Sequence, residues 1–314
     1  MSAAQPILTV TLNTGLDHTL FLDELRLGYT QKVRTSTISM AGKPADASWV
    51  LGALGIPNLA TGFAAGDLGK QMEAMLRAHG SQTDFLWVAG ETRLNTVLVV
   101  AGESQQTTLT TETLQISAAD VAAFKLKLDG LLAGSAAMII GGSIPRCLGP
   151  EIYRDLVTLA GACGVPVVLD ASGENLAQGL LGRPAVIKPN QQELEAFVGR
   201  ALPAPADVLA AARQLRAQHG VAVIATLGKE GAFAVLPGRE YFIPPLDVPL
   251  VSAAGAGDAT VAGLATALAR RQPLEEGVRL GLAAAAAVVM QPGTADCRKE
   301  DVDRLLPLVQ LQPV

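Results

Sequence analysis

The chain has 314 residues, of which 49% are hydrophobic and 17% charged, a composition that excludes an intrinsically disordered protein. A net charge of −5 argues against a broad nucleic-acid-binding surface but leaves room for a local phosphate pocket. The three cysteines, Cys147, Cys163 and Cys297, are too widely spaced to indicate a disulfide framework or a zinc site. With no leader-like start and no membrane-length apolar segment, we expect a cytoplasmic protein that binds neither nucleic acid nor membrane.

The first part of the chain predicts two kinds of β-strand. Residues 7–13 (ILTVTLN) form a continuous apolar run, which is typical of a strand buried on both faces. Residues from about 18–39 and 92–113 instead alternate apolar and polar side chains, as strands with one exposed face do. These strands form either a small β lid over a site in the main sheet or an ordinary edge extension, and periodicity alone does not separate the two.

From residue 136 onward, short apolar runs alternate with helical patterns, which predicts a parallel sheet with helices on both faces. The predicted strands are residues 136–140, 165–170, 185–190 and 221–228, and the predicted helices are residues 150–163, 174–181, a segment with Glu193 and Phe197, and two Ala-rich helices within 257–290. Right-handed crossovers then give an α/β fold with a doubly wound, mainly parallel sheet. We expect one domain over residues 1–314, with its lid strands drawn from about 18–39 and 92–113.

The strongest local signal for chemistry is residues 255–258 (GAGD), which precede a long predicted helix. The first amides of a helix lack intrahelical partners and, together with the helix dipole, bind anions. Glycine at 255 and 257 would let a phosphate approach the backbone, and Asp258 could accept the proton of an attacking hydroxyl. For an isolated GAGD, ordinary helix capping by Asp258 is the alternative explanation.

Two further segments indicate a binding site, although each is weak alone. Gly42 and Lys43 lie before a predicted helix in AGKPAD (residues 41–46), where a lysine could hold an anionic substrate. The segment is not a Walker A loop, because Pro44 replaces the Ser or Thr of that motif. Asp17 follows the first strand in a turn-like segment, and open α/β sheets bind ligands at such strand ends.

Taken together, these segments resemble the ribokinase-like (PfkB) carbohydrate kinases, closest to the phosphosugar branch that contains the 1-phosphofructokinases. Eight motifs follow the family's order, at residues 11–17 (TLNTGLD), 41–43 (AGK), 91–95 (ETRLN), 142–145 (GSIP), 170–174 (DASGE), 188–194 (KPNQQEL), 226–232 (TLGKEGA) and 255–258 (GAGD). Any one of them is weak evidence, whereas eight in order are specific. The resemblance covers nearly the whole chain and implies a ribokinase-like fold and Mg²⁺-ATP-dependent phosphoryl transfer.

The resemblance also implies a role for each matching residue. Catalysis is expected of Asp258 as the base and of an anion hole formed by the amides of Gly255, Ala256 and Gly257. The residues expected near the nucleotide are Lys188, Asn190, Glu193, Thr226, Gly228, Gly231 and Gly257, with Glu193 reaching magnesium through water. The residues expected near the sugar are Asp17, Gly42, Lys43, Asp46, Arg93 and Ser143, with Lys43, Arg93 and, in the lid, Lys32 meeting the substrate's phosphate.

The substrate side departs from the family pattern at two positions. Pro44 stands where the family has glycine, which removes an N–H and predicts an extended Lys43. Asp46 stands where the family has an asparagine. A carboxylate 5–6 Å from a phosphate costs roughly 1–3 kcal/mol, or one to two decades in affinity, unless it is paired.

The resemblance predicts phosphorylation of the 6-hydroxyl of fructose 1-phosphate, giving fructose 1,6-bisphosphate. Alternative substrates are tagatose 6-phosphate, fructose 6-phosphate or another sugar. A further alternative is a degenerate kinase that binds nucleotide or sugar and acts as a regulator. Because two lids clasp each other in this family, the resemblance also predicts a homodimer.

Overall fold

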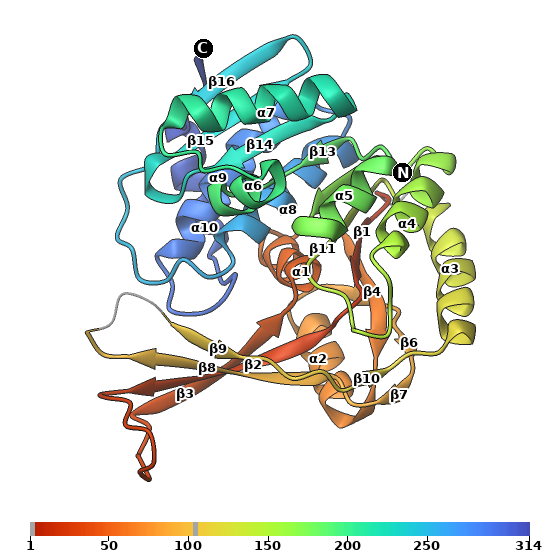
Figure 1. Ribbon diagram of the computed structural model, residues 1–314, viewed down its shortest axis with the longest axis vertical. Helices are drawn as coiled ribbons and strands as arrows, with labels where there is room; N and C mark the ends of the chain where they lie inside the picture. Colours follow the sequence, from red (N-terminus) through yellow and green to blue (C-terminus); the bar gives the residue numbers. More distant parts are fainter. Residues whose placement is uncertain (1–3, 103–105) are drawn as a thin grey trace.

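The computed structural model describes residues 4–102 and 106–314, which form a large β-sheet, helices on both its faces and a smaller sheet at one end (Figure 1). The strand order of the large sheet is β17 (Gln312–Pro313), β16 (Arg239–Ile243), β15 (Ala232–Leu236), β14 (Ala222–Thr226), β13 (Val186–Ile187), β12 (Val167–Asp170), β11 (Ala137–Gly141), β1 (Ile7–Thr11), β4 (Asn58–Ala64) and β5 (Gln82–Thr83). β6 (Leu86–Trp87) also pairs with β4.

The central strands are parallel and buried on both faces, as their continuous apolar sequences predict. Every pair from β5 to β14 is parallel, and the pairs that join β14, β15, β16 and β17 are antiparallel. Successive side chains enter opposite cores: Leu8 and Val10 pack on one face of the sheet and Ile7 on the other. The predicted doubly wound, mainly parallel sheet is therefore confirmed.

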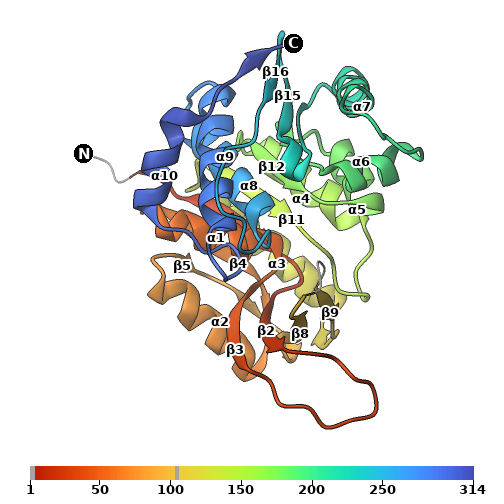
Figure 2. The same cartoon turned by 90° about the vertical axis from the view of Figure 1, so that its left-hand side faces the viewer.

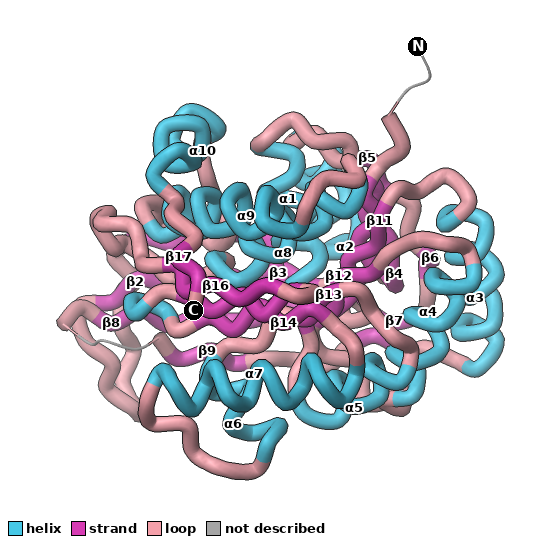
Figure 3. The backbone as a smooth tube through the Cα atoms, turned by 90° about the horizontal axis from the view of Figure 1, so that it is seen from above, coloured by secondary structure: helices cyan, strands magenta, loops and turns pink. Residues whose placement is uncertain are grey.

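Helices cover both faces of this sheet (Figure 3). One face carries α3 (Ala118–Leu132), α4 (Glu151–Ala162), α5 (Gly173–Leu181), α6 (Gln191–Val198) and α7 (Pro205–His219). The other carries α1 (Lys43–Ala53), α8 (Ala256–Ala269), α9 (Leu274–Val289) and α10 (Lys299–Leu305), followed by a short 3₁₀ turn, η2 (Leu306–Leu308). In the described part of the chain, no helix has the length and apolar character required to span a membrane.

The two Ala-rich helices predicted near the C-terminus are α8 and α9, and they pack unusually closely. A Cβ atom added at Gly263 of α8 would lie 2.2 Å from the backbone nitrogen of Gly281 in α9. Glycine at these positions therefore lets the two backbones touch. The contact holds α8, which begins within the GAGD segment, against α9.

A four-stranded sheet, called the lid below, projects from one end of the molecule (Figures 1 and 2). Its strand order is β3 (Thr35–Ala41), β2 (Gly15–Leu22), β8 (Arg93–Val100) and β9 (Thr107–Leu109). These strands overlap the two segments in which the sequence predicts lid strands. α2 (Gly66–Ala78) packs against β2, and a separate two-stranded ladder joins β7 (Ala89–Gly90) to β10 (Leu114–Gln115).

Candidate active site

The GAGD segment forms the turn by which the chain enters α8. Gly255 has a left-handed φ of 85°, and a Cβ atom there would lie 2.2 Å from the backbone nitrogen of Ala295, so the turn requires glycine. The Ala295 N–H donates to the Ala254 carbonyl oxygen at 3.1 Å, which ties the turn to the loop after α9. Because the first amides of a helix have no intrahelical acceptor, this end of α8 is suited to binding an anion.

Asp258 lies in the first turn of α8 and is only 8% exposed. Burial raises its pKa to about 7, and the nearby Asp170 adds to the rise, while Lys43 and Lys188 oppose it. A carboxyl group that titrates near neutral pH can accept a proton from a hydroxyl in the range where enzymes usually work. Asp258 therefore has the properties of a general base.

Two lysines and two carboxylates form an ion-pair network beside this helix end. Lys43 Nζ lies 2.8 Å from both Asp170 Oδ1 and Glu193 Oε1, and Lys188 Nζ lies 3.3 Å from Asp170 Oδ2. Burial alone would raise the pKa of Asp170, but the two lysines hold that pKa below its usual value. A Cβ atom at Gly257 would lie 3.2 Å from Lys188 Nζ, so this ammonium group lies directly against the GAGD turn.

Asn190 and Glu193 begin α6 as a reciprocal capping box. Asn190 Oδ1 accepts a hydrogen bond from the Glu193 N–H at 2.8 Å, and Glu193 Oε2 accepts one from the Asn190 N–H at 2.9 Å. Since its Oε1 binds Lys43, both carboxylate oxygens of Glu193 already have protein partners. Any contact of Glu193 with magnesium remains a prediction.

The remaining residues predicted near the nucleotide lie in the turn after β14. Thr226 ends that strand and forms a parallel bridge to Asn190. The short helix η1 (Gly228–Glu230) follows, and Gly228 and Gly231 adopt positive φ values of 59° and 98°. Parallel neighbours present their carboxyl ends at one edge of a sheet, where open α/β folds bind ligands. These residues thus lie along the expected edge, and their contact with a nucleotide remains a prediction.

A second polar cluster lies where the lid meets the main body. Asp17 on β2 is opposite Asn95 on β8, and Asn95 Nδ2 donates to Asp17 Oδ1 at 2.7 Å. Burial raises the pKa of Asp17, against the opposing effects of Asn95 and Arg93. Of the seven enclosed side-chain atoms that lack a hydrogen-bond partner among the described residues, three belong to this region, namely Arg93 Nε, Asn95 Oδ1 and Asp46 Oδ1. Enclosed polar atoms normally have partners, so a charged group in this cluster is poorly compensated by its protein neighbours.

The loops around Gly42 and Ser143 complete this end of the site. Asn13 Nδ2 donates to Ser143 Oγ at 3.1 Å, which joins the loops that follow β1 and β11. Gly42 has a φ of 113° and precedes α1, whose first residue is Lys43. The predicted extended conformation of Lys43 is therefore wrong. Pro44 lies in the first helical turn, where a missing N–H costs no hydrogen bond.

The structure gathers many of the predicted residues into two polar clusters, and their roles remain predictions. It also adds two residues to which the sequence analysis gave no role. These are Asp170, which holds both lysines, and Asn95, which holds Asp17. Both belong to motifs that the sequence singles out, DASGE and ETRLN. Asp170 ends a buried strand, which is a usable signal, but its partner Lys43 is 127 residues away in the chain.

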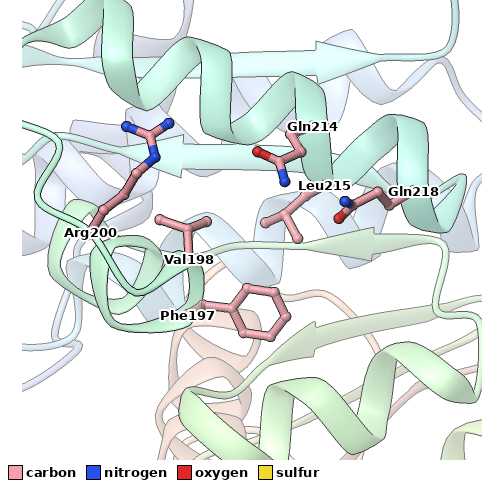
Figure 4. A pocket seen from close by; sticks show the side chains of 6 residues that line it. All are labelled: Phe197, Val198, Arg200, Gln214, Leu215 and Gln218. Carbon is pink, nitrogen blue, oxygen red and sulfur yellow. The ribbon is translucent and has the colours of Figure 1, made fainter.

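Two surface hollows lie outside this site. Figure 4 shows the first, of about 290 Å³, between α6 and α7, with Phe197, Arg200 and Gln214 among its lining residues. The second, of about 280 Å³, lies where α3 and α4 begin and includes Cys147. Their lining residues include none from the two polar clusters, and we assign neither hollow a function.

Comparison with known proteins agrees with this geometry. The model of the pfkB family carbohydrate kinases matches residues 13–301. A 1-phosphofructokinase of Escherichia coli strain K12 is 32% identical over 98% of both chains, and a tagatose-6-phosphate kinase of Staphylococcus epidermidis is 29% identical over 97% of this chain and 99% of its own. The crystal structure of phosphofructokinase-2 from Escherichia coli in complex with potassium superimposes with a TM-score of 0.89 at 26% identity, covering 96% of this chain and 98% of that one. The chain therefore belongs to the pfkB family of carbohydrate kinases.

Proposed function

We propose that this carbohydrate kinase is a 1-phosphofructokinase, which transfers the γ-phosphoryl group of ATP to the 6-hydroxyl of fructose 1-phosphate. The observation that carries the proposal is Asp258, a buried carboxyl with a pKa of about 7 at the anion-binding end of α8. The relatives at about 30% identity over the full chain support the choice of sugar.

The geometry gives each group a task in phosphoryl transfer. Asp258 would take the proton of the attacking hydroxyl, and the amides of Gly255, Ala256 and Gly257 would stabilise charge on the transferred group. Lys43 and Lys188 lie beside this turn and would neutralise phosphate charge. Such positioning and charge neutralisation account for most of catalysis in phosphoryl transfer.

The donor set fits a magnesium ion bound mainly by the nucleotide. Among the described residues, no group of three or more His, Cys, Asp or Glu side chains could hold a metal ion by itself. Mg²⁺ typically keeps several waters and takes one or two carboxylates plus substrate phosphates. Glu193 would supply a second-sphere oxygen through water, and the ion would neutralise phosphate charge when bound.

Tagatose 6-phosphate is the alternative substrate, because a tagatose-6-phosphate kinase is among the similar relatives. ATP turnover should be measured with fructose 1-phosphate, fructose 6-phosphate, tagatose 6-phosphate and free fructose. We expect kcat/KM to be highest for fructose 1-phosphate, by about tenfold or more over each other sugar. A preference for tagatose 6-phosphate would establish the alternative, and binding without turnover of any sugar would indicate a regulator.

We also propose a cytoplasmic homodimer of single-domain subunits that associate through the lid. In the loop between β2 and β3, Leu27 is 88% exposed and Tyr29 is 75% exposed, and on β9 Leu109 is 56% exposed. Large exposed apolar side chains on the lid and on the loop that joins two of its strands indicate a surface that is covered in the assembled protein.

Light scattering is therefore expected to give twice the chain mass at micromolar concentration. Leu27→Glu combined with Tyr29→Glu should shift the protein to monomers, because the charges would be buried in the contact. Leu126→Glu on α3 is the matched control, since Leu126 is 77% exposed away from the lid. A wild-type protein that is monomeric at this concentration would contradict the proposal.

A further inference from the structure

Asp46 occupies an unusual environment for a carboxyl group. It lies in the first turn of α1 and is 5% exposed, and its Oδ1 is fully enclosed without a hydrogen-bond donor among the described residues. Its other oxygen, Oδ2, is not enclosed in this way. Any contact between this side chain and a ligand therefore involves Oδ2.

The charges that face Asp46 are mostly negative. They are Asp258 from α8, Asp17 from β2 and Arg93 from β8. Arg93 is shared, because Asp17 and Glu112 also act on it. The strands that pack on α1, which are β1, β3, β4 and β11, contain no titratable side chain. α2 carries charges, but these form the pairs Asp67–Lys70 and Glu73–Arg77 within that helix.

The guanidinium group of Arg93 cannot neutralise both Asp46 and Asp17. An ionised carboxylate with an enclosed oxygen and no donor is costly, and such a group takes up a proton instead. Burial, followed by the effects of Asp258 and Asp17, raises the pKa of Asp46 well above its usual value, and Arg93 only partly opposes this. The uncharged acid then resembles an amide in shape, with one donor and one acceptor.

We propose that Asp46 contacts the sugar as a neutral carboxylic acid, donating a hydrogen bond from Oδ2, and that its ionisation excludes a phosphorylated substrate. This inference rests on the proposed function, since it assumes an anionic sugar in the site. It also explains how the chain can bind a phosphorylated sugar although Asp46 replaces the asparagine of the family pattern. The expected loss of affinity applies only to the ionised form, so a phosphorylated sugar is accepted while Asp46 keeps its proton.

The test compares the sugar KM of the wild type and Asp46→Asn between pH 6 and pH 9. In the wild type, KM should rise wherever Asp46 ionises, by about 10- to 100-fold over the complete ionisation, because a carboxylate then faces the phosphate. In Asp46→Asn, KM should stay nearly constant, and KM for ATP should change little in either protein. Ionisation of the substrate's phosphate affects both proteins equally and cancels in the comparison.

A second readout does not depend on turnover. Because the folded-state pKa of Asp46 lies above its unfolded value of about 3.8, the wild type should lose stability as pH rises from that value through the folded-state pKa. Asp46→Asn should lack this loss, so its melting temperature should exceed that of the wild type by more at pH 8 than at pH 5. Asp155→Asn, a surface control that removes a pair with Lys125, should not change the pH dependence.

The outcomes separate this inference from the proposed function. If the wild type prefers another sugar over fructose 1-phosphate, the proposed function fails, and the same KM comparison is then made with the preferred sugar. If Asp46→Asn shows the wild-type rise in KM, or the wild-type pH dependence of stability, Asp46 is not a neutral acid in the site and the inference is overturned.

Discussion

Asp258→Asn is expected to lower kcat for phosphoryl transfer by about 10²–10⁴, the usual contribution of a general base. The amide has nearly the same shape as the carboxyl group but cannot accept the hydroxyl proton. The fold should be retained, because the substitution removes a buried acid whose ionisation is unfavourable. The measurement is kcat with saturating ATP and fructose 1-phosphate, together with thermal unfolding to show that the variant is folded.

The pH dependence of turnover and of stability tests the same role of Asp258. In the wild type, kcat at saturating sugar should rise with pH through about 7, because only ionised Asp258 can act as the base. Stability should change in the opposite sense: the folded-state pKa lies above the usual 3.8, so stability is lost as pH rises through this range. Asp258→Asn should lack the rise in kcat and the part of the stability loss that Asp258 contributes, while the part contributed by Asp46 remains. Near-normal turnover in the variant would show that another group accepts the proton.

Asp170→Asn is expected to cause the largest loss of stability, roughly 3–5 kcal/mol, because it removes the counter-ion of a buried charge. Lys188 is 4% exposed and pairs with Asp170 Oδ2, so the substitution would leave its ammonium group enclosed without a carboxylate. Lys43 keeps Glu193 as a partner and is partly exposed, so the loss of its contact with Asp170 should contribute less to the loss of stability. The free energy of unfolding should be measured by urea denaturation.

Asp155→Asn is the matched control for this substitution. Asp155 also pairs with a lysine, Lys125, at 2.7 Å, but the two side chains are 33% and 39% exposed. Solvent screens such pairs, so the control should cost less than about 1 kcal/mol. Equal losses in the two variants would mean that the Asp170 network is solvated like a surface pair, and the electrostatic account of the site would fail.

Local patterns in the sequence were enough to predict the architecture. Continuous apolar runs predicted the buried parallel strands, because a strand covered by helices on both faces needs apolar side chains in both directions. The exceptions are short elements: residues 185–190 were expected to be a strand, but β13 covers only Val186–Ile187. The chain then turns, and Asn190 instead caps α6.

Asp258 and its turn could be predicted because both depend on neighbours in the chain. The glycines of the GAGD segment allow the turn into α8 without help from distant residues. Asp258, in the first turn of that helix, lies beside the backbone amides that precede it in the sequence. The same holds for the capping box of Asn190 and Glu193, which spans four consecutive residues. Motif order along the chain then identified the family.

The ionisation of the site was decided only by the tertiary structure. Nothing near Lys43 in the sequence shows that it pairs with Asp170, 127 residues away, and nothing near Asp17 shows that it pairs with Asn95, 78 residues away. Asp46 was expected to carry a charge, because an aspartate in water does. Folding encloses it beside Asp258 and Asp17, and burial and like charges favour the neutral form. The sequence thus predicted which groups lie in the candidate site, whereas their charge depends on solvent exclusion and on neighbours that only the fold brings together.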